Sequence, residues 1–141
     1  MDSHIHNAAS TNGPGSGLNL SGAQIDDIIK GGIPISGLFD LGPFRYSWLQ
    51  PKILLSHEEI VQQSPLLQIP DSAPPLWITL GEDEHDEFHR QAAAYLHAWQ
   101  ASGHSGSVQA MPGLNHFTVV ADLASPDSQL TTGVRDFIAR L

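Results

Sequence analysis

The stretch Leu76-Trp77-Ile78-Thr79-Leu80-Gly81-Glu82-Asp83-Glu84 joins a short apolar run to a group of carboxylates. Near-continuous apolarity is typical of a strand in a parallel sheet, because such a strand is covered on both faces. Apolar residues at helical spacing follow over residues 87–101, and a second short strand is predicted at 107–111. We therefore expect a buried strand that ends in acidic residues, then a helix, then a parallel neighbouring strand.

The same alternation extends to both sides of this stretch. A β-branched run at 33–37 predicts another strand, the capping box at 56–59 predicts a helix to about Gln63, and a helix is expected over 127–141. Helices alternating with strands indicate an α/β fold, here about three parallel strands flanked by helices. Residues 1–17 are rich in Gly, Ser and Asn and are expected to be a flexible leader, which leaves 18–141 as one domain.

Composition excludes several classes of function. The chain has 141 residues, with 6 basic against 15 acidic side chains and a net charge of −9, which argues against nucleic-acid or anionic-membrane partners. There are no cysteines, so disulfides and thiolate metal sites are excluded. The apolar runs are too short to span a bilayer, and the N-terminus lacks a signal pattern. A cytoplasmic location is the expectation.

Two predicted strand ends could together supply acid–base chemistry. The loop 82–84 leaves one strand and the loop 112–116 leaves the next, and parallel sheets keep their ligand sites at the carboxyl ends of the strands. Adjacent strands lie about 5 Å apart, so a carboxylate on the first loop can reach the imidazole of His116 on the second. Such a carboxylate would orient the ring and stabilise the imidazolium. A solvated loop is the alternative, favoured for Glu82, Asp86 and Glu87.

Three blocks of the sequence, in this order along the chain, resemble a known family: Ser36-Gly37-Leu38-Phe39-Asp40-Leu41, the run from Glu84 to Gln91, and Asn115-His116-Phe117. Together they resemble the C-terminal half of an α/β-hydrolase, in particular the arylformamidase (kynurenine formamidase) and related carboxylesterase group. The resemblance implies that His116 is the general base and that Glu84 is the acid of a catalytic triad. Asp83 is the alternative acid, Asp40 is a third and weaker one, and neither a metal nor an organic cofactor is implied.

The nucleophile of such a triad is missing from this sequence. The His-Gly-Gly motif and the Gly-x-Ser-x-Gly elbow of the group do not occur. The nearest imitation, residues 103–107 around Ser105, follows a predicted helix and precedes a strand, whereas an elbow needs a strand before it and a helix after it. We expect Ser105 to be a turn residue.

The expected function is therefore hydrolysis of a carboxylic ester or aryl formamide, with this chain supplying the acid and the histidine. The alternative is a catalytically inactive truncated or split fragment that acts as an interaction module. A small-molecule substrate is expected, together with an N-terminal hydrolase half or a second copy at the open edge of strand 33–37. Aromatic residues between 38 and 52 are expected either to line a pocket or to pin their loop to the core.

Overall fold

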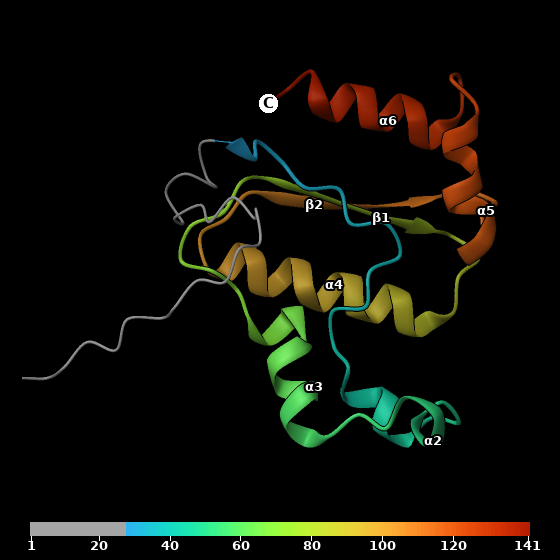
Figure 1. The fold of residues 1–141 in the computed structure, drawn as a ribbon. Coiled ribbons are helices and arrows are strands. Elements are labelled where there is room, and N and C mark those ends of the chain that lie inside the picture. Colours follow the sequence, from blue (N-terminus) through green and yellow to red (C-terminus); the bar gives the residue numbers. More distant parts are fainter. Residues whose placement is uncertain (1–27) are drawn as a thin grey trace, which may run out of the picture.

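The computed structural model describes residues 28–141, and the predicted leader and the first residues of the predicted domain lie outside this range. Its elements follow one another along the chain (Figure 1). They are η1 Gly42–Tyr46, α2 Gln50–Ile53, α3 His57–Gln63, η2 Pro65–Leu67, β1 Leu76–Gly81, α4 Asp86–Ala101, β2 Gly106–Met111, α5 His116–Ala121, η3 Asp122–Ala124 and α6 Gln129–Ile138.

The sheet in the described residues has two named strands, β1 and β2, which pair in parallel. Their register places Leu76 opposite Gly106 and Gly81 opposite Met111, and α4 is the crossover between them. Every residue of β1 is buried, as its near-continuous apolarity predicts. This part of the chain is therefore a partial α/β fold.

The third predicted strand, at 33–37, is not a regular strand. The chain there runs parallel to β1 but makes only two isolated bridges, Gly32 with Leu76 and Ile35 with Thr79. Pro34 explains the interruption. In a regular ladder the residue at this position donates its N–H to the carbonyl of Trp77, and proline has no N–H. The carbonyl of Pro34 still accepts from the Thr79 N–H at 2.8 Å. The segment 32–36 is thus a discontinuous third row beside β1.

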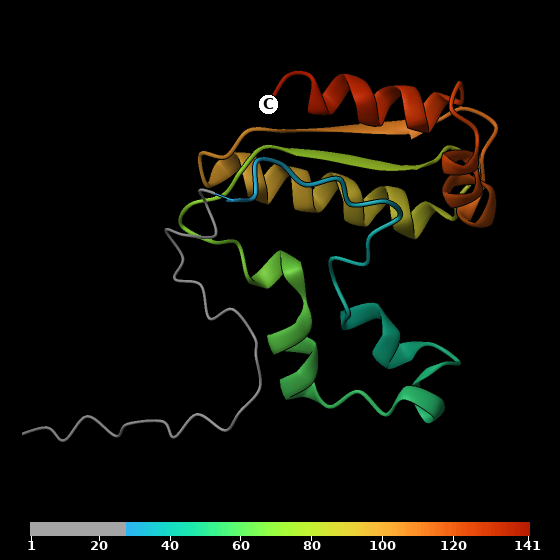
Figure 2. The same ribbon diagram turned by 45° about the horizontal axis from the view of Figure 1, so that its top comes forward.

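Helices cover both faces of the sheet, with α4 on one face and α6 on the other (Figures 1 and 2), and an apolar layer lies on each face. Alternate residues of β1 point to opposite faces, so Leu76, Ile78 and Leu80 pack with the α4 side chains Tyr95 and Trp99. The opposite face of the sheet contributes Trp77 and Met111, which pack with Val119 of α5 and with Leu130 and Phe137 of α6. In Figure 2, α2 and α3 lie beyond α4, away from the sheet.

Side-chain caps define where most of the helices begin. Ser56 and Glu59 form the predicted capping box of α3, and Ser128 caps α6 by accepting from the Thr131 N–H. The closing helix runs only from Gln129 to Ile138, shorter than the predicted 127–141. Among residues 28–141, no helix is both long and apolar enough to cross a membrane.

Candidate active site

Glu84 occupies the turn directly after β1, and the end of that strand fixes its side chain. The side chain of Glu84 is fully buried, and its Oε1 accepts a hydrogen bond from the N–H of Gly81 at 2.8 Å. An ideal Cβ at position 81 would lie 2.2 Å from the carbonyl oxygen of Leu114, so only glycine lets the two loops approach this closely. The end of β1 and the loop after β2 are therefore in direct contact.

His116 comes from that second loop and meets the same carboxylate. Its Nδ1 lies 2.9 Å from Oε2 of Glu84, and because an ionised carboxylate only accepts, Nδ1 carries the proton. The sequence suggested a turn at His116, but the residue is the first of α5, capped by Asn115. Its side chain is 48% exposed, and Nε2 has no hydrogen-bond partner within residues 28–141. This geometry leaves Nε2 available to exchange a proton with a third group.

A serine that the sequence did not point to completes the surroundings of Glu84. The hydroxyl of Ser36 donates to Oε1 of Glu84 at 2.5 Å. Ser36 lies in the first of the three resemblance blocks, yet no spacing in the sequence relates it to a residue 48 positions away. Each oxygen of the carboxylate is therefore bonded, Oε1 by Ser36 and Gly81, and Oε2 by His116.

The protonation of Glu84 reflects two opposing effects. Burial raises the pKa of a carboxyl, but the hydrogen bonds from Ser36, Gly81 and His116 outweigh it and hold the pKa of Glu84 below its usual value. The carboxylate is thus charged at neutral pH although it is shielded from water. A buried carboxylate in this state can hold the tautomer of His116 and stabilise the ring when it gains a proton.

The two alternative acids lie elsewhere. Asp83 is exposed, and its backbone N–H donates to the carbonyl of Leu114, while Glu84 alone of the pair reaches His116. Asp40 forms an ion pair with Arg90 at 3.2 Å. The geometry therefore brings one carboxylate to the imidazole.

The two longer resemblance blocks contact each other. Gln91 is buried, and its Oε1 accepts from the N–H groups of Phe39 and Asp40 while its Nε2 donates to the carbonyl of Asp40. Glu87 accepts from both Arg90 and Gln91, and its hydrogen bond from Arg90 is the main cause that lowers its pKa to about 2. These hydrogen bonds hold the chain after Ser36 against the first turns of α4. Because Glu84 lies just before α4, they also help to hold Ser36 near Glu84.

An apolar cavity of about 450 Å³ is lined in part by Phe88, a neighbour of His116. It is lined by Leu38, Pro43, Phe44, Ser47, Trp48, His85, Glu87, Phe88 and Gln91. The ring of Phe88 also lies against His116, with 4.8 Å between the ring centroids. Of the aromatic residues in the loop 38–52, Phe44 and Trp48 line this cavity, whereas Phe39 belongs to the core. Both predicted roles of that loop are therefore present.

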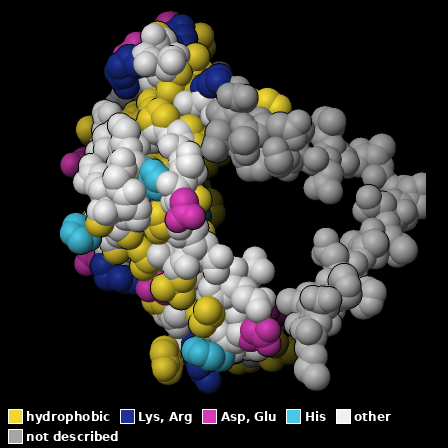
Figure 3. Space-filling view, turned by 90° about the vertical axis from the view of Figure 1, so that its left-hand side faces the viewer, with side chains coloured by type: hydrophobic (Ala, Val, Ile, Leu, Met, Phe, Trp, Pro, Cys, Tyr) yellow, Lys and Arg dark blue, Asp and Glu magenta, His cyan; other side chains and the backbone are white. Residues whose placement is uncertain are grey.

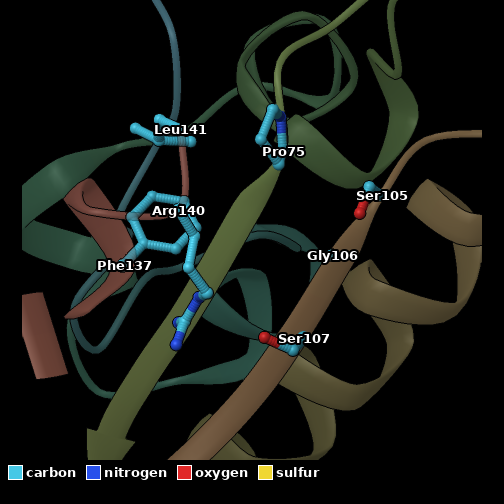
Figure 4. Close-up of a pocket in the computed structure, with 7 residues that line it drawn as sticks. All are labelled: Pro75, Ser105, Gly106, Ser107, Phe137, Arg140 and Leu141. Atoms are coloured by element: carbon cyan, nitrogen blue, oxygen red, sulfur yellow. The ribbon is translucent and has the colours of Figure 1, made fainter.

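A second cavity, of about 380 Å³, lies at the opposite, amino ends of the strands (Figure 4). Ser105 lines it together with Ser107 and Arg140. The carbonyl of Ser105 accepts from the Leu76 N–H at 3.0 Å, which places this serine where β2 starts. Ser105 follows the turn at 102–103 and lies at the opposite end of the strands from His116.

The described surface offers neither a metal cluster nor, on the face displayed, a basic patch. Within residues 28–141, no group of three or more His, Cys, Asp or Glu side chains could hold a metal ion. Figure 3 shows the face at the amino ends of the strands, where the Lys and Arg side chains are separated from one another.

Comparison with known proteins gives a consistent set of relatives. No protein-family model matches the chain. Kynurenine formamidases of Danio rerio and Salmo salar are 22% and 24% identical to it, each over 73% of this chain and 37% of the relative. The chain is related to arylformamidase- and esterase-like hydrolases. A solved structure from Silicibacter sp., described as a candidate thioesterase, superimposes with a TM-score of 0.62 at 24% identity over 73% of this chain and 37% of that one.

The relationship to these hydrolases is partial in length. The chain spans 37% of each of the curated relatives that it matches. At 24% identity the solved structure supports a shared hydrolase-like fold alone.

Proposed function

We propose that this chain supplies the acid and the base of a serine-type hydrolase that cleaves carboxylic esters or aryl formamides. The observation that supports the proposal most strongly is the 2.9 Å bond between the buried carboxylate of Glu84 and Nδ1 of His116, at the carboxyl ends of adjacent strands. The kynurenine formamidase relatives support the substrate class. The nucleophilic serine comes from a polypeptide segment that this sequence does not contain.

In this proposal His116 moves the protons and Glu84 holds it in place. Nε2 of His116 takes the proton of the serine hydroxyl as the serine oxygen attacks the carbonyl carbon, and a tetrahedral intermediate forms. The imidazolium then gives that proton to the leaving alcohol or amine as its bond to the carbonyl carbon breaks, which leaves the acyl-enzyme. A water attacks the acyl-enzyme in the second half, with His116 again taking and returning a proton. Glu84 stays ionised and stabilises the imidazolium in both halves.

The apolar cavity suits one part of such a substrate. Phe44 and Trp48 form one side of it and Phe88, which also touches His116, forms another. Aromatic walls next to the base favour an aryl group or an apolar acyl chain at this place. We expect the chain to act in the cytoplasm, on a small molecule, without a metal or an organic cofactor.

The outer edge of segment 32–36 is where we place the partner. Residues 32, 34 and 36 use their backbone groups toward β1, so those of Ile33 and Ile35 point the other way. These groups have no hydrogen-bond partner within residues 28–141. We propose that a parallel strand from the nucleophile-bearing half covers this edge, and that a second copy of the chain covers it when that half is absent.

A chimera tests the hydrolase. Residues 28–141 are fused behind the part of the Danio rerio relative that precedes the matched region, and hydrolysis of short acyl aryl esters and aryl formamides is measured. We expect turnover, loss of nearly all of it in His116→Ala, and a larger loss in Glu84→Ala than in Asp83→Ala, since triad members act as a unit. A larger loss in Asp83→Ala would move the acid by one position, and a fully active His116→Ala chimera would refute the proposal.

The second candidate function, an inactive fragment that acts as an interaction module, is favoured by the missing nucleophile motif. It makes a separate prediction for residues 1–141 alone. We expect no esterase activity above background, because the nucleophile and oxyanion hole supply most of the rate enhancement in such sites. Activity in the isolated chain that Ser105→Ala abolishes would instead make Ser105 the nucleophile.

A further inference from the structure

Ser36 has an unusual backbone for the residue that it is. Its φ is 50°, in the left-handed region, which is disfavoured for any side chain that has a Cβ. Glycine or asparagine would adopt this conformation more easily. The Ser36 N–H donates to the carbonyl of Thr79 at 2.8 Å, so the neighbouring strand holds the backbone in place. Serine at this position is therefore explained by its hydroxyl rather than by its backbone preference.

The hydroxyl is directed at one atom. Oγ of Ser36 donates to Oε1 of Glu84 at 2.5 Å, and Oε1 also accepts from Gly81, so the carboxylate cannot rotate about its terminal bond without losing both donors. Fixing Oε1 in this way leaves Oε2 pointing at Nδ1 of His116. Strained backbone that is held by its surroundings is common next to functional groups.

We propose that Ser36 is a positioning residue, whose left-handed backbone aims its hydroxyl so that the carboxylate of Glu84 stays oriented toward His116. The positioning itself is a property of this chain. Its meaning for catalysis rests on the hydrolase proposed above. A merely structural role, in which the hydroxyl only satisfies a buried acceptor, would affect stability and the pKa of Glu84 but would leave the hydrogen bond between Glu84 and Nδ1 of His116 unchanged.

Two substitutions at the same position separate the hydroxyl from the backbone. Ser36→Ala removes Oγ and keeps the unfavourable φ, whereas Ser36→Gly removes Oγ and relieves it. The carboxyl carbon of Glu84 and the ring nitrogens of His116 are followed by NMR from pH 3 to 9 in residues 1–141, with Ser107→Ala as a control for removing an exposed hydroxyl.

We expect both Ser36 variants to raise the pKa of Glu84 and to shift the Nδ1 proton of His116 upfield, with Ser107→Ala unchanged. Ser36→Gly should recover thermal stability relative to Ser36→Ala while showing the same titration. If Ser36→Ala fails to fold, the glycine variant alone decides. An unshifted Nδ1 proton of His116 in Ser36→Gly would overturn the proposal.

The chimera separates this proposal from the hydrolase. There we expect Ser36→Gly to lower kcat by up to about 10²-fold with little change in KM, because the variant disturbs the orientation of His116 rather than substrate binding. If no chimera hydrolyses any ester while the NMR shifts occur as expected, the proposed function fails and the positioning stands. If the chimera is active and neither its kcat nor the Nδ1 proton of His116 responds to Ser36→Gly, the positioning fails and the function stands.

Discussion

Gly81 is the position where one added methyl group should separate the two halves of the candidate site. A Cβ there would lie 2.2 Å from the carbonyl oxygen of Leu114 and 2.7 Å from its carbonyl carbon. Comfortable contacts between such atoms begin near 3.4 Å, so the two loops must separate by about 1 Å. Both neighbours are backbone atoms, and a change of side-chain rotamer therefore cannot relieve the clash.

The expected loss of folding stability follows from the groups that the added methyl displaces. Overpacking costs about 1–3 kcal/mol, and we expect the upper end for Gly81→Ala because the displaced carbonyl of Leu114 also accepts the Asp83 N–H at 2.9 Å. A loss of about 3 kcal/mol shifts the unfolding equilibrium by roughly 10²-fold. The same separation lengthens the bond between Glu84 and His116, so the Nδ1 proton signal should weaken or disappear.

Urea unfolding followed by tryptophan fluorescence measures the first effect, and NMR measures the second. Gly113→Asn is the matched control. Gly113 precedes Leu114 on the loop that Gly81 contacts, no atom comes within 4 Å of a Cβ there, and asparagine tolerates its positive φ. We expect the control to stay within about 1 kcal/mol of the parent and to keep the Nδ1 proton signal. Gly81→Ala with the parent's stability and an intact Nδ1 signal would refute the reasoning.

Three further outcomes are expected. The folded pKa of Glu84 lies below its unfolded value, so its contribution to stability is full above about pH 5 and declines as the pH falls through the folded pKa. Glu84→Gln should therefore make the urea midpoint less dependent on pH in this acidic range, and an unchanged dependence would contradict the prediction. Gly133→Ala should destabilise the protein by about 1–3 kcal/mol in thermal unfolding, since its Cβ would lie 2.2 Å from the ring of Trp77, and a neutral effect would mean that α6 can shift. Sedimentation of residues 1–141 should show dimers or larger species through the edge at 33–37, and a compact monomer at high concentration would count against that edge.

The sequence predicted correctly those elements whose signals lie within a few neighbouring residues. The near-continuous apolar run predicted β1, and Ser56 with Glu59 predicted the start of α3, because both signals act within a few residues. The third strand was predicted too regularly. Pro34 lies within the β-branched run that predicted it, and the ladder needs a donor at this position to reach the carbonyl of Trp77.

The candidate site was predicted only in part for a different reason. The sequence and the family resemblance indicated Glu84 and His116 as a pair, and the structure places them in contact, while their catalytic roles stay predictions. Ser36 was missed because a hydroxyl that donates across 48 residues leaves no periodic or local signal. The start of α5 at His116 was missed because its cap, Asn115 with Thr118, opens a helix of only six residues.

The contacts around Glu84 also determine when the site can form during folding. Its side chain bonds to residues 48 positions upstream and 32 positions downstream, whereas α3 and α4 depend on contacts within a few residues. Closing loops of that length costs chain entropy before any bond is gained, so local helices precede such contacts. The carboxylate of Glu84 therefore becomes buried and fully bonded only after the sheet has assembled. During refolding, the Nδ1 proton of His116 should appear last, and would report completion of the native state.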